Sequence, residues 1–191
     1  VKVGLDRFSS VLLLALVQAV IAMPILPFIV QPNAAAWPWI LASALLHAGY
    51  KVFLIDAYTH GDLSQIYPVA RGSAPLIVAL ASGPLIGETL SAQGLAAVLL
   101  IGLGVVLMSI KGGADLGRMT GKALAYALGT AFFTASYTIV DGVGARIAGS
   151  ASGFILWMVM GDAVGMVAYA LWRRGAGAFP ALVAAWRVGL A

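Results

Sequence analysis

Six stretches of the chain are almost bare of charge, and each is about as long as a bilayer is thick. They are residues 10–30, 37–57, 66–86, 92–110, 123–141 and 151–172. A helix rises about 1.5 Å per residue, so it needs about 20 residues to cross a hydrocarbon core about 30 Å thick. Transmembrane barrel strands are shorter, at about 10 residues, and alternate apolar with polar positions. The pattern therefore predicts an all-α fold, a polytopic bundle of transmembrane helices.

Composition narrows the function classes. The chain is 62% hydrophobic and 9% charged, with a mean hydropathy of +1.01, which excludes a soluble globular domain and a disordered chain. It contains no cysteine, so disulfides, thiolate metal sites and cysteine nucleophiles are excluded, and its two histidines disfavour a histidine metal site. The phosphate-binding pattern GxxxxGK[ST] does not occur. We therefore expect no cofactor, no metal and no ATP-driven mechanism.

Basic residues are concentrated on one side of the predicted bundle. With six spans, eight of the eleven cations flank the same face: Lys2, Arg7, Lys111, Arg118, Lys122, Arg173, Arg174 and Arg187. The opposite face has Arg146, and Lys51 and Arg71 lie within spans. The positive-inside rule makes the eight-cation face cytoplasmic, and with it both ends of this chain. The net charge of +4 then reflects orientation in the membrane rather than nucleic-acid binding.

The ends of the chain and a short repeat indicate a part of a larger architecture. The sequence begins with Val rather than Met and stops inside a new apolar segment, as an excised piece of a longer protein would. VKVGLDR at residues 1–7 resembles VDGVGAR at residues 140–146. Five spans separate the two copies if a missing upstream helix is counted, and an odd number of helices inverts the second copy. Inverted repeats of this kind are typical of secondary transporters.

Polar and aromatic residues recur at helical spacing in three of the predicted spans. The three sets are His47, Tyr50, Lys51 and Tyr58; Tyr67, Arg71, Pro75 and Ser82; and Tyr126, Thr130, Phe133, Thr134, Tyr137 and Asp141. Residues three or four apart share a helix face, so each set forms a stripe. Charge at the bilayer centre costs about 2.5–3.5 kcal/mol on insertion scales, which predicts that the stripes face a shared hydrated cavity.

For some residues of the stripes, a role other than lining the cavity is also open. Ser82, Thr130 and Thr134 are expected to join helices through hydrogen bonds. Lys51 either faces the cavity or extends along its span to the interface. Arg71 is expected in the cavity, because Pro68 and Pro75 flank it and should break the helix there.

Asp162 lies near the middle of the sixth span, in WMVMGDAVGMV. A carboxylate at that depth is a candidate proton or cation carrier, and we name it as a candidate coupling residue. The alternative is that Gly161 and Gly165 pack the helix tightly on a neighbour, with a protonated Asp162 buried in the contact. Asp141 and Glu88 are expected at or beyond span ends, where no buried role is needed.

The passage between the second and fourth spans carries a family resemblance. Its residues are Ala57, Gly61, Asp62, Leu63, Ser64, Tyr67, Pro68, Arg71, Gly72 and Pro75, then Gly87 and Glu88. Together they resemble the "A…hGdls…YPlaRg…P" passage and the following "gE" turn of the EamA-like branch of the drug/metabolite transporter superfamily. YTIVDGVGAR resembles the start of that family's second repeat.

The resemblance implies a ten-helix transporter of two inverted five-helix repeats. Residues 1–111 would be the first repeat without its first helix, and residues 112–191 the incomplete start of the second. The second, third and fifth spans would be the helices that line the family's central cavity. We therefore predict substrate-binding roles for seven residues. They are His47, Tyr50, Lys51, Tyr67, Arg71, Thr134 and Tyr137.

The functional prediction is a secondary transporter that moves a small organic metabolite or drug by alternating access, not an enzyme. Its expected partners are a small-molecule substrate and the lipid bilayer, with no nucleic acid; a homodimer is left open. The expected location is the cell membrane, as a multi-pass protein of the bacterial inner membrane. A non-transporting interaction or lipid-handling protein is the first alternative. An intramembrane aspartyl protease using Asp141 and Asp162 is a remote one.

Overall fold

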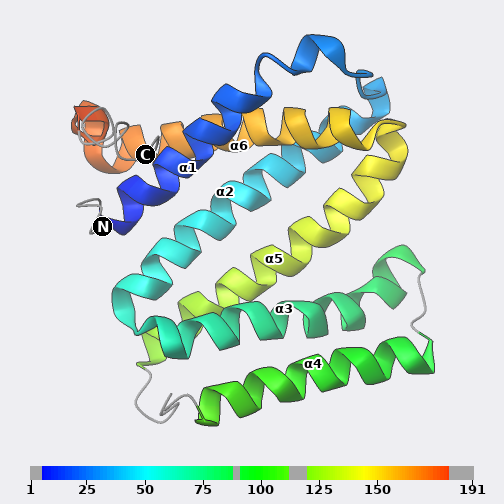
Figure 1. Cartoon of the computed structure of the whole chain (residues 1–191), viewed down its shortest axis with the longest axis vertical. Coiled ribbons are helices and arrows are strands. Elements are labelled where there is room, and N and C mark those ends of the chain that lie inside the picture. Colours follow the sequence, from blue (N-terminus) through cyan, green and yellow to red (C-terminus); the bar gives the residue numbers. More distant parts are fainter. Residues whose placement is uncertain (1–5, 88–90, 112–119, 181–191) are drawn as a thin grey trace. The chain divides into compact units, whose positions relative to one another are not determined.

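In the computed structural model, residues 6–87, 91–111 and 120–180 are described, and every regular element among them is helical. Figure 1 shows their order. The α-helices are α1 (Arg7–Ala22), α2 (Trp37–His60), α3 (Leu63–Ile86), α4 (Ala92–Lys111), α5 (Gly121–Ala148) and α6 (Ala151–Arg174). Short 3-10 turns are η1 (Leu26–Phe28), η2 (Ala34–Ala36) and η4 (Gly175–Gly177). The predicted all-α fold is confirmed for these residues.

Four segments of the described chain are long and apolar enough to cross a membrane. They are Ala34–His60, Ile66–Ile86, Gly121–Ala148 and Ala151–Pro180. The other two predicted spans are also helical: α1 (Arg7–Ala22) has 16 residues and α4 (Ala92–Lys111) has 20. By length and hydropathy this is the helix set of a multi-pass membrane protein.

The first helix is shorter than predicted. Asp6 caps α1 by accepting a hydrogen bond from the Ser9 amide at 3.2 Å, and the helix ends at Ala22 rather than running to residue 30. Pro24 and Pro27 follow, and a proline has no N–H for the carbonyl four residues before it. The 16 residues of α1 are about 24 Å long, less than a hydrocarbon core.

The third and fifth helices also differ from expectation. The predicted break in α3 is wrong, because the helix runs unbroken through Pro68, Pro75 and Pro84. Each proline leaves the carbonyl four residues earlier without a backbone donor, and for Pro75 that carbonyl belongs to Arg71. Helix α5 continues seven residues past its predicted end to Ala148, so Asp141 lies inside a helix.

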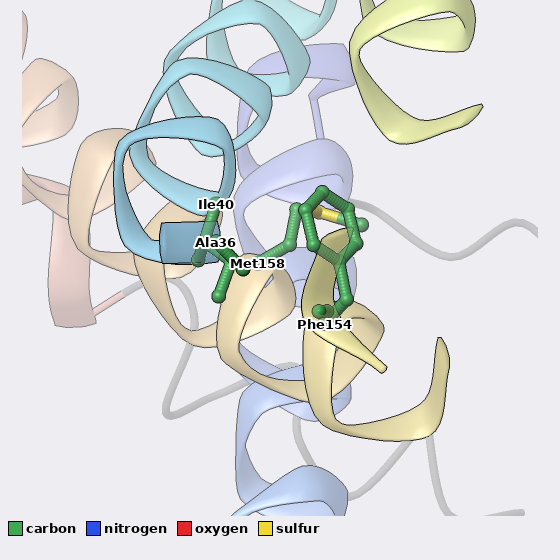
Figure 2. Close-up of a cluster of buried hydrophobic side chains, with 5 residues drawn as sticks. Ala36, Ile40, Phe154 and Met158 are labelled. Carbon is green, nitrogen blue, oxygen red and sulfur yellow. The ribbon is translucent and has the colours of Figure 1, made fainter. Parts of the chain in front are cut away.

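The chain divides into two compact units. The first contains Val1–Ala48 and Asp141–Ala191, and therefore α1, the first part of α2, the end of α5, and α6. Its core cluster, drawn in Figure 2, joins Phe154 and Met158 of α6 to Ile40 of α2, with Ala36 and Ala148 beside them. Burial of these apolar side chains holds the three helix ends together.

Helix α6 lies close against α2 along small residues. A Cβ added at Gly161 would lie 2.8 Å from the Cβ of Ala44, and one at Gly165 would lie 3.1 Å from the Cβ of Ala48. Glycines four residues apart allow two helix backbones to approach closely in a membrane. The GxxxG pair is therefore a helix-packing contact, as the second interpretation of this segment predicted.

The start of α1 and the end of α6 are joined by an ion pair. Arg174 pairs with Asp6, and its guanidinium lies 4.2 Å from the ring centroid of Phe8. The hydrogen bond from Arg174, helped by the Ser9 contacts, lowers the pKa of Asp6 to about 2. Helices α1 and α6 pack against each other, and Figure 1 shows α1 crossing α6 obliquely.

The second unit is Gly49–Val140, comprising the rest of α2, α3, α4 and most of α5. Helices α3 and α4 run antiparallel and side by side (Figure 1). Its core cluster consists of Ala57, Ile66, Ala70, Ala123 and Ala127. The predicted repeat boundary adjoins residues 112–119, which lie outside the described chain, as do residues 1–5 of the first copy of the repeat at residues 1–7. Both stay predictions.

Candidate functional site

The second unit contains a cavity of about 430 Å³ whose walls come from α3, α4 and α5. Its lining residues are Arg71, Ala74, Pro75, Val78, Ala79, Ser82, Val98, Thr134 and Thr138. Four of them are alanine, valine or proline on α3 and a fifth apolar residue, Val98, lies on α4, so most of the wall is apolar, and Arg71 is its one charged group. A cavity of this size suits a small organic molecule.

Arg71 is held by an aromatic group from α2. Its Nη2 donates a hydrogen bond of 2.8 Å to the hydroxyl of Tyr50, and its guanidinium carbon lies 5.5 Å from the centre of that ring. The Tyr50 ring in turn meets the Tyr137 ring of α5 edge to face, with centroids 5.8 Å apart. Residues from three predicted stripes therefore meet beside the cavity.

The hydroxyl groups of the stripes bond within their own helices rather than across helices. Ser82 donates to the carbonyl of Val78 at 2.7 Å, Thr130 to that of Tyr126 at 2.7 Å, and Thr134 to that of Thr130 at 2.9 Å. The prediction that these hydroxyls join neighbouring helices is wrong for these three hydrogen bonds, because each lies within one helix. Each hydroxyl hydrogen is donated to a carbonyl of the same helix. The oxygens of Ser82 and Thr134, which line the cavity, can therefore act there as hydrogen-bond acceptors.

Other predicted site residues lie elsewhere. Tyr67 is 52% exposed and does not belong to the cavity lining. Lys51 is buried on α2, with 8% of its surface exposed. His47 belongs to the first unit. The sequence periodicity placed these residues on polar faces but did not show which of them border the cavity.

His47 forms a polar cluster in the first unit that the sequence did not reveal. Ser43 donates a short hydrogen bond to Oδ1 of Asp141, and Nε2 of His47 lies 3.8 Å from Oδ2 of the same carboxylate. Nδ1 of His47 lies 3.0 Å from the carbonyl oxygen of Ser43. The expectation that Asp141 sits at a span end is wrong, because α5 extends beyond it.

Asp162 lies on α6 in the same unit and is 2% exposed. It is next to Gly161, where α6 packs on α2. Its burial beside a helix contact is the geometry expected from the packing interpretation, and its coupling role stays a prediction.

The first unit has a second hollow, of about 370 Å³, between α1 and α6. Its lining residues are Leu16, Ala19, Met160, Ala163, Val164, Val167, Ala168 and Leu171. All eight are apolar, so this groove offers no hydrogen bond or charge to a polar solute. It suits an acyl chain or another helix.

Among the described residues, no group of three or more His, Cys, Asp or Glu side chains is arranged to hold a metal ion. Comparison with protein families, with curated proteins and with solved structures finds no match to this chain. The family resemblance therefore rests on the motif residues alone.

Proposed function

We propose that this chain is part of a secondary transporter that carries a small organic solute across a membrane. The observation that carries the proposal is Arg71 on the wall of an otherwise apolar cavity, bonded to Tyr50, within a set of membrane-length helices. A guanidinium cannot lose its proton at ordinary pH, and such a charge within a transmembrane segment marks a substrate or ion pathway as a rule.

The chemistry of the cavity favours a solute with an anionic group and an apolar body. The guanidinium has five N–H donors, and the Tyr50 hydroxyl takes one of them. The remaining donors suit a carboxylate or phosphate, which arginine binds through two parallel hydrogen bonds. The alanine, valine and proline side chains of α3 would cover the rest of the solute, and the oxygens of Ser82 and Thr134 would accept from its polar hydrogens.

The wider architecture belongs to the same proposal. The motif around Tyr67, Pro68 and Arg71 supports assignment to the drug/metabolite transporters, with ten helices in two inverted repeats and a location in the bacterial inner membrane. Alternating access would then move the two repeats around the solute, driven by a gradient rather than by ATP.

The test is uptake into proteoliposomes, using this chain and the longer reading frame if the 191 residues are part of one. The probes are radiolabelled small carboxylates, amino acids and organic phosphates. We expect Arg71→Gln to weaken binding of the transported probe by about 30-fold or more, the equivalent of about 2 kcal/mol for a truncated charge pair. Arg71→Lys should recover part of it, because charge remains but paired hydrogen bonds do not.

Two variants serve as controls. Lys122→Gln removes a cation at the start of α5, away from the cavity lining, and should leave uptake unchanged. Tyr50→Phe keeps the ring contact with Tyr137 but deletes the hydroxyl that holds Arg71, so its loss should be intermediate. Normal saturable uptake by an inserted Arg71→Gln protein contradicts the assigned site, and absence of flux with every probe class contradicts the transporter proposal.

A further inference from the structure

The apolar groove between α1 and α6 has the length and the surface of a site for a lipid acyl chain. Its α6 wall extends from Met160 to Leu171, which is about 16 Å along the helix axis. One leaflet of a bilayer contributes about half of a hydrocarbon core about 30 Å thick, so the two lengths agree. Val164 in this wall is 68% exposed, so the groove is open along its side. Every lining residue is apolar, as an acyl chain requires.

A charged side chain lies in line with the groove at one end. Arg174 follows Leu171 by three residues, so the two side chains share a face of α6. On α1 the groove is lined by Leu16, and Ser9 lies on the same helix face two turns earlier. The hydroxyl oxygen of Ser9 is 3.5 Å from Nη1 of Arg174. The Arg174 guanidinium therefore lies at the same α1–α6 interface as the groove.

Aromatic and acidic partners orient the arginines at this end. The Arg174 guanidinium lies 4.2 Å from the ring centroid of Phe8, and it also pairs with Asp6. Arg173 donates a hydrogen bond to the hydroxyl of Tyr169, and its guanidinium carbon lies 5.7 Å from the centroid of that ring. A guanidinium has five N–H donors, and the Arg174 side chain is 40% exposed. A phosphate group can therefore bind beside these partners.

Aromatic side chains at the same end of α6 indicate the level of the lipid headgroups. Trp172 is 81% exposed, and its ring packs on Tyr169 with centroids 5.9 Å apart. Tyr169 in turn packs on Phe8, with centroids 6.0 Å apart. Tryptophan and tyrosine are enriched where membrane helices meet the headgroups. A lipid chain in the groove would therefore place its headgroup beside Arg174 rather than beside Met160.

The charge at this end favours an anionic headgroup. Among the described residues, the start of α1 and the end of α6 carry three arginines and one carboxylate, which leaves a net charge of +2; they are Arg7, Arg173, Arg174 and Asp6. The amine of a zwitterionic headgroup would meet like charge there. A headgroup whose charge is the phosphate alone is attracted by these cations.

We propose that the groove between α1 and α6 binds an acyl chain of an anionic phospholipid, with the lipid phosphate at Arg173 and Arg174. The inference does not depend on the proposed transport, because none of these groups lines the solute cavity. The bound lipid contacts both helices along the groove and at the arginines. It therefore adds to the packing that joins α1 to α6.

The test is a lipid titration of the purified 191-residue chain in mild detergent, read by native mass spectrometry. The probes are phosphatidylglycerol and phosphatidylcholine with identical acyl chains, and glycerol phosphate as a headgroup without chains. Each cation near a membrane surface raises the affinity for anionic lipid about fivefold, so a net charge of +2 predicts a preference of about 25-fold for phosphatidylglycerol. Glycerol phosphate should not bind at the same concentrations, because it has no chain for the groove.

Two kinds of variant separate the headgroup contact from the chain contact. Arg173→Gln and Arg174→Gln should each lower the preference for phosphatidylglycerol about fivefold. Ala168→Phe keeps every charge and places a ring in the groove from an exposed position, so it should weaken both lipids at least fivefold and leave their ratio unchanged. Two matched controls should bind both lipids as the wild type does: Lys122→Gln on α5, and Leu14→Phe at an exposed position of α1 outside the groove lining.

Four results overturn the proposal. Equal wild-type affinity for the two lipids excludes selection of the anionic headgroup. Unchanged phosphatidylglycerol binding by a monodisperse Ala168→Phe protein places the lipid outside the groove. A wild-type dimer that Ala168→Phe dissociates shows that a second copy occupies the groove, and loss of selective lipid binding in a longer reading frame shows that another helix covers it. Arg173→Gln leaves the pair of Arg174 with Asp6 in place, so the charge comparison holds even if Arg174→Gln does not fold.

Discussion

The close approach of α6 to α2 allows a stability experiment with an internal standard. Gly161→Ala adds a methyl group whose carbon would lie 2.8 Å from the Cβ of Ala44. Ordinary contact between such carbons begins at 3.4 Å, so the helices must separate by at least 0.6 Å at this point. Neither atom can rotate away, because each is fixed directly to a helix backbone.

The expected change in stability of Gly161→Ala is the sum of two opposed effects. Overpacking of this kind costs about 1–3 kcal/mol, while replacing glycine by alanine within a helix gains about 1 kcal/mol. Gly142→Ala measures the gain alone, since a Cβ at Gly142 on α5 has nothing within 4 Å. We therefore expect the Gly161→Ala protein to be less stable than the Gly142→Ala protein by about 1–3 kcal/mol.

The assay is equilibrium unfolding in mixed micelles, with thermal loss of the monodisperse elution peak as an independent measure. The double variant Ala44→Gly/Gly161→Ala removes the opposing methyl group and should recover stability, with a coupling of about 1 kcal/mol or more in the double-mutant cycle. If Gly161→Ala equals or exceeds Gly142→Ala in stability, or if the double variant shows no coupling, α6 does not lie on α2 at these residues.

Two further predictions concern the ends of the helices. The chain has no cysteine, so a single introduced cysteine reports on which side of the membrane a turn lies. A cysteine replacing Asp62, in the turn between α2 and α3, should be shielded from an impermeant thiol reagent in intact cells, whereas one replacing Ser152, at the start of α6, should be labelled. The reverse labelling pattern would show that the predicted orientation is inverted. The low pKa of Asp6, about 2 against an ordinary 3.8, means that its pair with Arg174 stabilises the protein above about pH 4 and that this contribution is lost as the pH falls to about 2. Because Asp6 is 48% exposed we expect at most about 1 kcal/mol, measured as the acid slope of stability that Arg174→Gln removes; an unchanged slope in that variant excludes the pair.

Hydropathy located all six helices, because a membrane-length apolar run has few other structures available to it. The errors in the helices lie at the ends of α1 and α5 and at the prolines of α3, which the helix accommodates without a break. The apolar residues after Ala22 extended the predicted first span past Pro24, where the backbone has no donor to continue the helix. The predicted fifth span stops at Asp141, although α5 contains that aspartate and Arg146 and ends at Ala148, just before Gly149, whose φ is +67°.

The sequence identified the polar residues of the site more readily than the residues that they contact on other helices. Spacing placed Tyr50, Arg71 and Tyr137 on polar faces, and the structure brings these three together. Periodicity describes one helix at a time, so it contained no information on which faces meet. For that reason the contact of Ser43 and His47 with Asp141, on a helix about a hundred residues away in sequence, was not predictable from either stripe.

The hydroxyl ladder on α5 has a consequence for how the protein is made. Thr130, Thr134 and Thr138 each donate to the carbonyl four residues earlier, so every one of these hydrogen bonds lies within a single helix. A newly synthesised α5 can satisfy them as soon as it is helical, before any other segment has entered the bilayer. Its threonines therefore add little to the cost of insertion, and the helix does not need a partner beside it while it leaves the translocation channel.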